Sequence, residues 1–386
     1  MLDVVHPWET WLATLSHKQE RNRTKMEIPT MNPQALNEFA KICFTNKETL
    51  LVTGPPGCAK TAVIKDAARE IGYNIIMIHL CVSAPIDAKG LPCFSDNPIN
   101  GEKEADFIPF GDMRDMMDAT KPTVVILDDF GTAPISVQTG YMQVVQERRL
   151  NKFPISEHVT FALITNRSQD KSGANQGVIE TIKGRSVIVP VRADVDVWVD
   201  YVRKNGVADY SDEPYDACPP ELMAFTRWVN SKSEPLFEFS ASKNVEEQTC
   251  TPRNLSRMGR IINRYADIGK DITKIPLAVL HGTVGSVVGT KLAGFSKTVS
   301  KLPPIKDILA DPQGTRVPTE PNECYALIGF LANKTDMKNM HLIVPYVLRI
   351  STEFRVLYTQ DIATKKALRQ HDSFKELLQN TKIVLD

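Results

Sequence analysis

The most constraining feature of the sequence is the stretch Gly54-Pro55-Pro56-Gly57-Cys58-Ala59-Lys60-Thr61. A short apolar run at residues 50–53 precedes it, and residues 61–71 follow with helical periodicity. A glycine-rich turn between a strand and a helix that ends in Lys and Thr is the pattern of a phosphate-binding loop. The alternative, an unrelated Gly/Pro turn, leaves the flanking strand and helix unexplained. The stretch therefore predicts a nucleotide site within an α/β domain.

The individual positions of this loop have distinct expected roles. Small residues within 54–61 are expected to let backbone N–H groups converge on phosphate oxygens, and the following helix presents its positive N-terminal end. Lys60 is expected to reach the β- and γ-phosphates, and Thr61 to place its hydroxyl on Mg²⁺. Ala59 stands where glycine is usual, and we expect it to have a negative φ because its Cβ disfavours the left-handed region. Cys58 is interpreted as a small filler; a reactive, low-pKa thiol beside Lys60 is the alternative.

Short apolar runs between about residues 33 and 191 predict a central parallel sheet. They are rich in Leu or β-branched residues, which is typical of strands that are buried on both faces. Helical segments between them, at 61–71 and 137–148, complete the alternation of an α/β sandwich. The runs lie at residues 50–52, 75–78, 124–127, 162–164 and 187–189.

Polar side chains follow two of these runs. Asp128 and Asp129 end the third run, and Asn166 follows the fourth. Because parallel strands end at one sheet edge, we expect these residues to lie near the phosphate loop. Asp128 would hold Mg²⁺, Asp129 would orient or deprotonate the attacking water, and Asn166 would hydrogen-bond that water and the γ-phosphate. Taken alone, each residue also fits an ordinary turn after a strand.

Two arginines are further candidates. Arg185 precedes the last apolar run and could reach the nucleotide of a neighbouring subunit as an arginine finger. Arg253 follows Pro252 near a predicted helix start and could reach back to the γ-phosphate. For both residues the alternative is a surface arginine.

The sequence also predicts how the chain is divided. Residues 1–32 form an N-terminal extension with a short helix whose apolar stripe is Trp8, Trp11, Leu12 and Leu15. The nucleotide-binding core spans 33–195, and a smaller lid domain spans 196–301 with helices at 196–205, 220–231, 254–267 and 277–294. The last part, 302–386, begins with a proline-rich extended connector at 302–321 and continues as helices.

Composition narrows the class of protein. The chain has 46 basic and 46 acidic residues, and this neutral total argues against wrapping long stretches of nucleic acid. It contains no run of about 18 apolar residues that could span a membrane, and its start lacks the features of a secretory signal. Seven scattered cysteines fit reduced thiols, so we expect a cytoplasmic protein.

In their order along the chain these motifs resemble the AAA+ ATPases, and within them the MoxR-like branch. The resemblance covers about residues 33–300. It implies that the matching positions are Walker A, Walker B, sensor 1, arginine finger and sensor 2. The matching text is 54–61, Leu127-Asp128-Asp129-Phe130-Gly131, Asn166-Arg167, Gly184-Arg185 and Thr251-Pro252-Arg253.

The resemblance implies a fold, a cofactor and partners. The fold is a P-loop NTPase αβα sandwich with a central five-stranded parallel sheet, followed by a helical lid. The cofactors are ATP and Mg²⁺, and the assembly is a ring, usually hexameric, with ATP at subunit interfaces. The function is remodelling of protein clients, among them clients with a von Willebrand factor A domain. Asp129 replaces a usual glutamate, so we expect low but measurable ATPase activity.

Two other functions remain open: an ATP-dependent nucleic-acid motor or loader, which the neutral charge disfavours, and a scaffold in which ATP only orders a ring. The segment 83–112 lies between the second and third runs, where insertions in related rings face the pore or the client. Phe107 and Phe110 are candidate client contacts there, and packing on the core is the favoured alternative.

Overall fold

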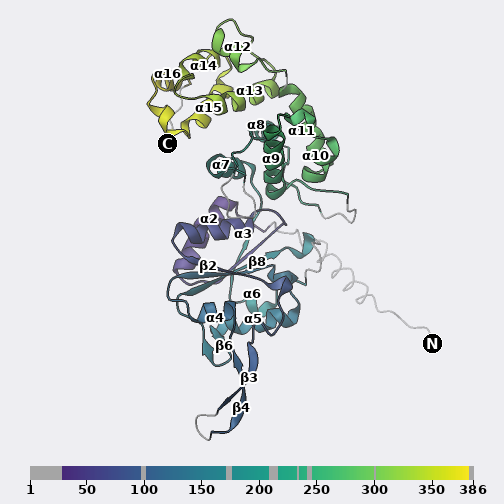
Figure 1. Ribbon diagram of the computed structural model, residues 1–386, viewed down its shortest axis with the longest axis vertical. Coiled ribbons are helices and arrows are strands. Elements are labelled where there is room, and N and C mark those ends of the chain that lie inside the picture. Colours follow the sequence, from purple (N-terminus) through teal and green to yellow (C-terminus); the bar gives the residue numbers. More distant parts are fainter. Residues whose placement is uncertain are drawn as a thin grey trace, which may run out of the picture.

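The computed structural model describes residues 28–96, 101–170, 176–207, 216–232, 234–240, 246–299 and 301–381. The predicted helix around Trp8 and Trp11 lies outside these residues. An α/β core carries a larger helical region above it in the view of Figure 1. No helix in the described part of the chain is both long enough and apolar enough to cross a bilayer.

A five-stranded parallel sheet forms the centre of the core, in the order β2-β5-β8-β1-β9. Each apolar run predicted from the sequence is one of these strands, so the α/β sandwich prediction is confirmed. Strand β5, between β2 and β8, is buried from its first residue to Leu127, as expected for a strand covered on both faces. The strands are β1 (Leu50–Gly54), β2 (Asn74–His79), β5 (Thr123–Asp128), β8 (Val159–Asn166) and β9 (Val187–Pro190).

Helices cover both faces of this sheet (Figure 1). Val124 and Ile126 of β5 pack in one apolar cluster with α2 (Pro33–Thr45) and α3 (Lys60–Glu70). Val125 and Leu127 point the other way, because successive strand residues alternate between faces. They pack with a second set of helices, α4 (Asp112–Met117), α5 (Ile135–Glu147) and α6 (Glu180–Lys183).

A β-hairpin that the sequence analysis did not predict projects from the core (Figure 1). It consists of β3 (Leu91–Asp96) and β4 (Lys103–Ile108), which pair antiparallel. Phe107 is 39% exposed, so its expected packing on the core is wrong, whereas Phe110 is half-buried. A second small hairpin, β6 (Arg149–Leu150) and β7 (Phe153–Pro154), follows α5.

The helices that follow the core share one hydrophobic cluster around Leu222, Phe225 and Leu255. The predicted single helix at 277–294 is wrong, because the chain breaks at Gly285, which has φ 83. A Cβ at this position would lie 2.5 Å from the Gln248 carbonyl oxygen. The helices are α7 (Val195–Asn205), α8 (Pro220–Ser231), α9 (Pro252–Asp267), α10 (Leu277–Val284) and α11 (Ser286–Val299).

The C-terminal helices form a further cluster, which we call the C-terminal bundle (residues 302–381). The predicted extended connector is partly wrong: α12 begins after Pro304 and buries Ile308 completely. Proline is well suited to a helix start, so the prolines here flank a helix as well as a loop. The bundle contains α12 (Ile305–Ala310), α13 (Pro321–Lys334), α14 (Met340–Val347), α15 (Thr352–Ala363) and α16 (Asp372–Thr381).

Candidate nucleotide-binding site

The predicted phosphate loop connects β1 to α3, and its backbone differs from our expectation at one residue. Ala59 has φ 71 and ψ 16, so the prediction of a negative φ is wrong. The chain turns from the strand into the helix at this residue, and Lys60 is the first residue of α3. A left-handed alanine costs about 1–2 kcal/mol, which explains why glycine is usual here.

Lys60 occupies the inside of the loop. Its side chain is only 7% exposed, and Nζ donates at 2.9 Å to the carbonyl oxygens of Gly54 and Pro55. A third bond, also 2.9 Å, goes to Oδ1 of Asn166. Burial lowers the pKa of the Lys60 ammonium. The structure thus brings Lys60, at the start of α3, and Asn166, at the end of β8, together as expected.

The predicted metal-binding residues also meet. Thr61 Oγ1 donates to Asp128 Oδ2 at 3.0 Å. Burial, and then the charge of Asp129, raise the pKa of the Asp128 carboxyl. Within the described residues no cluster of three or more His, Cys, Asp or Glu side chains could hold a metal alone. Hydroxyl and carboxylate oxygens are nevertheless suitable Mg²⁺ ligands, and Mg²⁺ in nucleotide sites takes its other ligands from phosphate and water.

Asp129 lies directly beyond the end of β5 and is half-buried. It has φ 56, and its backbone N–H donates to Asp128 Oδ1 at 3.0 Å. The Cys81 thiol donates to Asp129 Oδ2 at 3.8 Å. The sequence analysis missed Cys81. Its position could have indicated this contact, because Cys81 lies two residues after the end of β2. Strand β2 pairs with β5 and places His79 opposite Asp128.

Arg253 is brought to the loop by the start of α9. Its backbone N–H donates to the Gly57 carbonyl oxygen at 3.3 Å. Thr251 packs so closely on Gly57 that a Cβ there would lie 2.7 Å from the threonine Oγ1. The positive charge of Arg253 also lowers the pKa of Lys60, so the guanidinium lies within electrostatic reach. The helical region thus contacts the loop directly.

Arg185 is not brought to the loop of its own chain. Its Nη1 donates to Gln146 Oε1 at 2.9 Å. It precedes β9, which runs parallel to β1, so Arg185 lies at the sheet edge opposite the phosphate loop. The four residues of β9 alone separate the two edges by roughly 13 Å.

Cys58 fills the loop as expected, and the alternative of a reactive thiol is wrong. The side chain is 2% exposed, and burial raises the pKa of its thiol despite the nearby Lys60 charge. A buried thiol with a raised pKa is a poor nucleophile because the thiolate is the reactive form.

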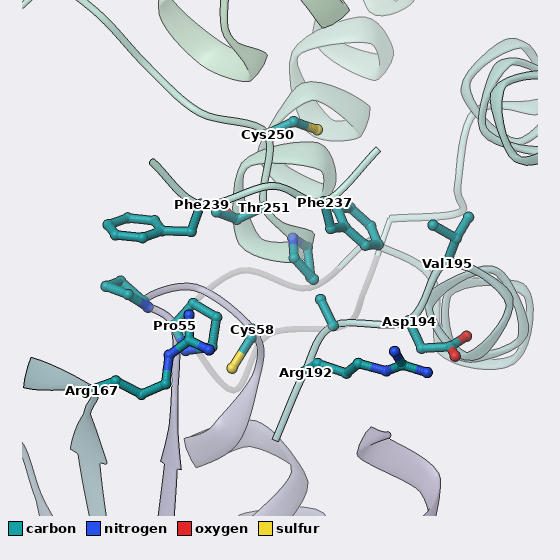
Figure 2. Close-up of a pocket in the computed structure, with 13 residues that line it drawn as sticks. Pro55, Cys58, Arg167, Arg192, Asp194, Val195, Phe237, Phe239, Cys250 and Thr251 are labelled. Atoms are coloured by element: carbon teal, nitrogen blue, oxygen red, sulfur yellow. The ribbon is translucent and has the colours of Figure 1, made fainter. Parts of the chain in front are cut away.

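A pocket of about 400 Å³ separates the loop from the helical region (Figure 2). This volume lies within the range of small-molecule sites. The sequence analysis missed most of its lining, because these residues come from connections without a motif. Besides residues of the loop, the lining comprises Arg167, Arg192, Ala193, Asp194, Val195, Phe237, Phe239, Cys250, Thr251 and Pro252.

A protein-family model described as "P-loop containing dynein motor region" matches residues 15–133. Over these residues the chain is similar to that motor region, and the core has the αβα fold of P-loop NTPases. The matched part of the core includes the phosphate loop, β5 and both acidic residues, Asp128 and Asp129. A search of the curated proteins found no match.

Solved structures similar to this chain include NtrX from Brucella abortus in complex with ATP. It is 12% identical, covers 97% of this chain and 74% of its own, and has a TM-score of 0.38. RuvB from Thermotoga maritima, a Holliday junction branch migration motor, is 10% identical, covers 90% and 86%, and has a TM-score of 0.31. These TM-scores are low, so the P-loop NTPase fold of the core is supported by the family model and by the sheet.

Proposed function

We propose that the protein binds ATP together with Mg²⁺ and hydrolyses it. The observation that carries this proposal is a pair of contacts at one sheet edge: Lys60 Nζ to Asn166 Oδ1 at 2.9 Å, and Thr61 Oγ1 to Asp128 Oδ2 at 3.0 Å. They join the ends of β1, β5 and β8 around the start of α3. Because a helix start attracts anions, this is a suitable position for a triphosphate.

Each side chain has one role in the proposed reaction. Lys60 binds the phosphates, while Thr61 and Asp128 hold Mg²⁺, which neutralises phosphate charge during the transfer. Asp129 orients the attacking water and accepts its proton, and Asn166 hydrogen-bonds the same water. Arg253 stabilises charge on the γ-phosphate. The residues of the loop other than Pro55 and Pro56 supply backbone N–H groups to the phosphate oxygens.

Calorimetry on the full chain tests nucleotide binding. We expect Mg²⁺–ATP to bind the native protein and Lys60→Ala to weaken binding by roughly 100-fold, because a charge-assisted contact is lost. Lys65→Ala, on the same helix, is the matched control and should bind as the native protein does. Failure of the native protein to bind Mg²⁺–ATP would refute the proposal.

We further propose a ring, usually of six subunits, that remodels protein clients as in the MoxR-like branch. The position of Arg185 supports an action across an interface, because it lies at the sheet edge away from its own phosphate loop. The client class, including clients with a von Willebrand factor A domain, comes from the sequence resemblance. A cytoplasmic location is supported by the seven free cysteines.

A mixing experiment tests the action of Arg185. Arg185→Ala and Asp129→Asn should each be nearly inactive alone. A mixture of the two should regain part of the ATPase activity, because each Asp129 variant still supplies Arg185 to a neighbour with an intact Asp129. Native turnover in Arg185→Ala, or no recovery on mixing, would rule out the action across an interface.

A further inference from the structure

Arg167 is a pocket residue to which the reaction proposed above gives no role. It directly follows Asn166 at the end of β8 and lines the pocket between the phosphate loop and the helical region. Figure 2 shows its side chain extending toward Pro55, on the side of the pocket where Phe239 also lies. Arg167 therefore belongs to the same wall as the loop, next to the residue that contacts Lys60.

A buried carboxylate fixes the direction of this arginine. Nε of Arg167 donates to Asp170 Oδ2 at 2.9 Å, and Nη2 donates to Oδ1 at 2.7 Å. Asp170 is only 6% exposed, whereas 32% of the Arg167 side chain is exposed. A guanidinium has five N–H donors, and this fork uses two of them. Among the described residues, the arrangement holds one edge of the guanidinium on Asp170 and leaves the other edge for an acceptor.

The charges around the loop suit a polyvalent anion. Three cations lie within electrostatic reach of the loop: Lys60, Arg167 and Arg253. The charges of Lys60 and Arg167 both lower the pKa of Cys58, and the charge of Arg253 lowers the pKa of Lys60. The acids Asp128 and Asp170 act on Lys60 in the opposite sense. With Asp129, which directly follows Asp128, three cations stand against three acids, so an anion is favoured by the positions of the cations around the loop and not by a net positive charge.

We propose that Arg167 contacts the terminal phosphate of the bound nucleotide and so makes the site prefer a triphosphate to a diphosphate. Asp170 is a positioning residue that aims the guanidinium. Arginine suits this role because its planar fork matches phosphate oxygens. This inference depends on the proposed function, namely that ATP binds at this loop.

The test compares two ligands on the full chain by calorimetry: a slowly hydrolysed ATP analogue and ADP, both with Mg²⁺. Arg167→Gln should weaken binding of the analogue by about 10- to 30-fold and change ADP binding by less than about twofold, because only the analogue carries the terminal phosphate. Arg167→Lys should retain part of the preference, and Asp170→Asn should lose part of it. Arg192→Gln, in the same pocket, is the matched control and should keep the native ratio of analogue affinity to ADP affinity.

Equal weakening of both ligands by Arg167→Gln would indicate a structural role and overturn the inference, as would unchanged binding of both. Thermal unfolding verifies that each variant is folded. If Arg167→Gln does not fold, the other two variants decide: the inference is overturned if Arg167→Lys and Asp170→Asn both keep the native ratio of analogue affinity to ADP affinity. If the native protein binds neither ligand, the proposed function fails; if it binds both and Arg167 has no selective effect, only this inference fails.

Discussion

Two charged side chains in this molecule are buried to the same extent but are stabilised in opposite ways. Lys60 in the α/β core and Asp361 on α15 are each 7% exposed. Asp361 accepts two bonds of 2.5 Å from Arg227 of α8, and one of 2.9 Å from Arg203 of α7. Within the described residues the oxygen acceptors of Lys60 are two backbone carbonyls and the amide of Asn166, with no carboxylate among them.

The difference separates a structural charge from a binding charge. The carboxylate of Asp361 is compensated inside the protein, which joins the C-terminal bundle to the preceding helices. The ammonium of Lys60 donates its hydrogen bonds to neutral dipoles, and burial lowers its pKa although the charges of Asp128 and Asp170 oppose this shift. A buried charge that is not in contact with a carboxylate is only partly compensated, so a bound anion would stabilise it further. Two side chains that are buried to the same extent can therefore have different roles, one in stability and one in ligand binding.

The largest effect is expected for Asp361→Ala. Removing this carboxylate leaves the guanidinium groups of Arg227 and Arg203 buried without their partner, which should lower the free energy of unfolding by about 3–5 kcal/mol. Urea unfolding followed by circular dichroism measures the loss.

Two controls make the comparison sharper. Asp200→Ala removes a 61%-exposed partner of the same Arg203 and should cost less than about 1 kcal/mol. Lys60→Ala should also change stability little, because no carboxylate loses a hydrogen-bond partner, although nucleotide binding is weakened. A large loss of stability in Lys60→Ala would contradict the distinction between the two charges.

An intermediate effect is expected at Ala59. Ala59→Gly removes the strain of a left-handed alanine and should raise the free energy of unfolding by about 1 kcal/mol. Ala62→Gly, an exposed position in the first turn of the same helix, is the matched control and should lower it by up to about 1 kcal/mol. Destabilisation by both substitutions would show that Ala59 is not strained in solution.

The smallest effect concerns pH and Asp128. Its pKa is raised in the folded protein, so the neutral carboxyl is favoured there. The stability that this group contributes is therefore complete below the pKa that it has in the unfolded chain, and it is lost as the pH rises through the higher pKa of the folded protein. Mg²⁺-dependent nucleotide binding should change in the opposite direction, because Mg²⁺ needs the ionised carboxylate. Asp128→Asn should remove both dependences, as titration monitored by calorimetry and by thermal unfolding can verify. A pH profile that survives in this variant would assign the effect to another group.

The sequence predicted those parts of the molecule that depend on local pattern. Continuous apolar runs specify buried parallel strands, and residues at their ends share one edge, so the meeting of Lys60, Asp128 and Asn166 was predictable. Backbone conformation at Ala59 was not, because glycine would have signalled it and alanine does not. The Asp361–Arg227 pair joins residues 134 positions apart, and no periodicity reports such a pairing.

Helix α7 links the pocket to the Asp361 pair. Its N-terminal residues Asp194 and Val195 line the pocket, and Arg203 near its other end binds Asp361. Over its 11 residues the helix is about 16 Å long. A tilt of α7 at the pocket would rotate the distal helices about that point. Their displacement would increase with their distance from the pocket, so a small change in angle would produce a large movement at the far end.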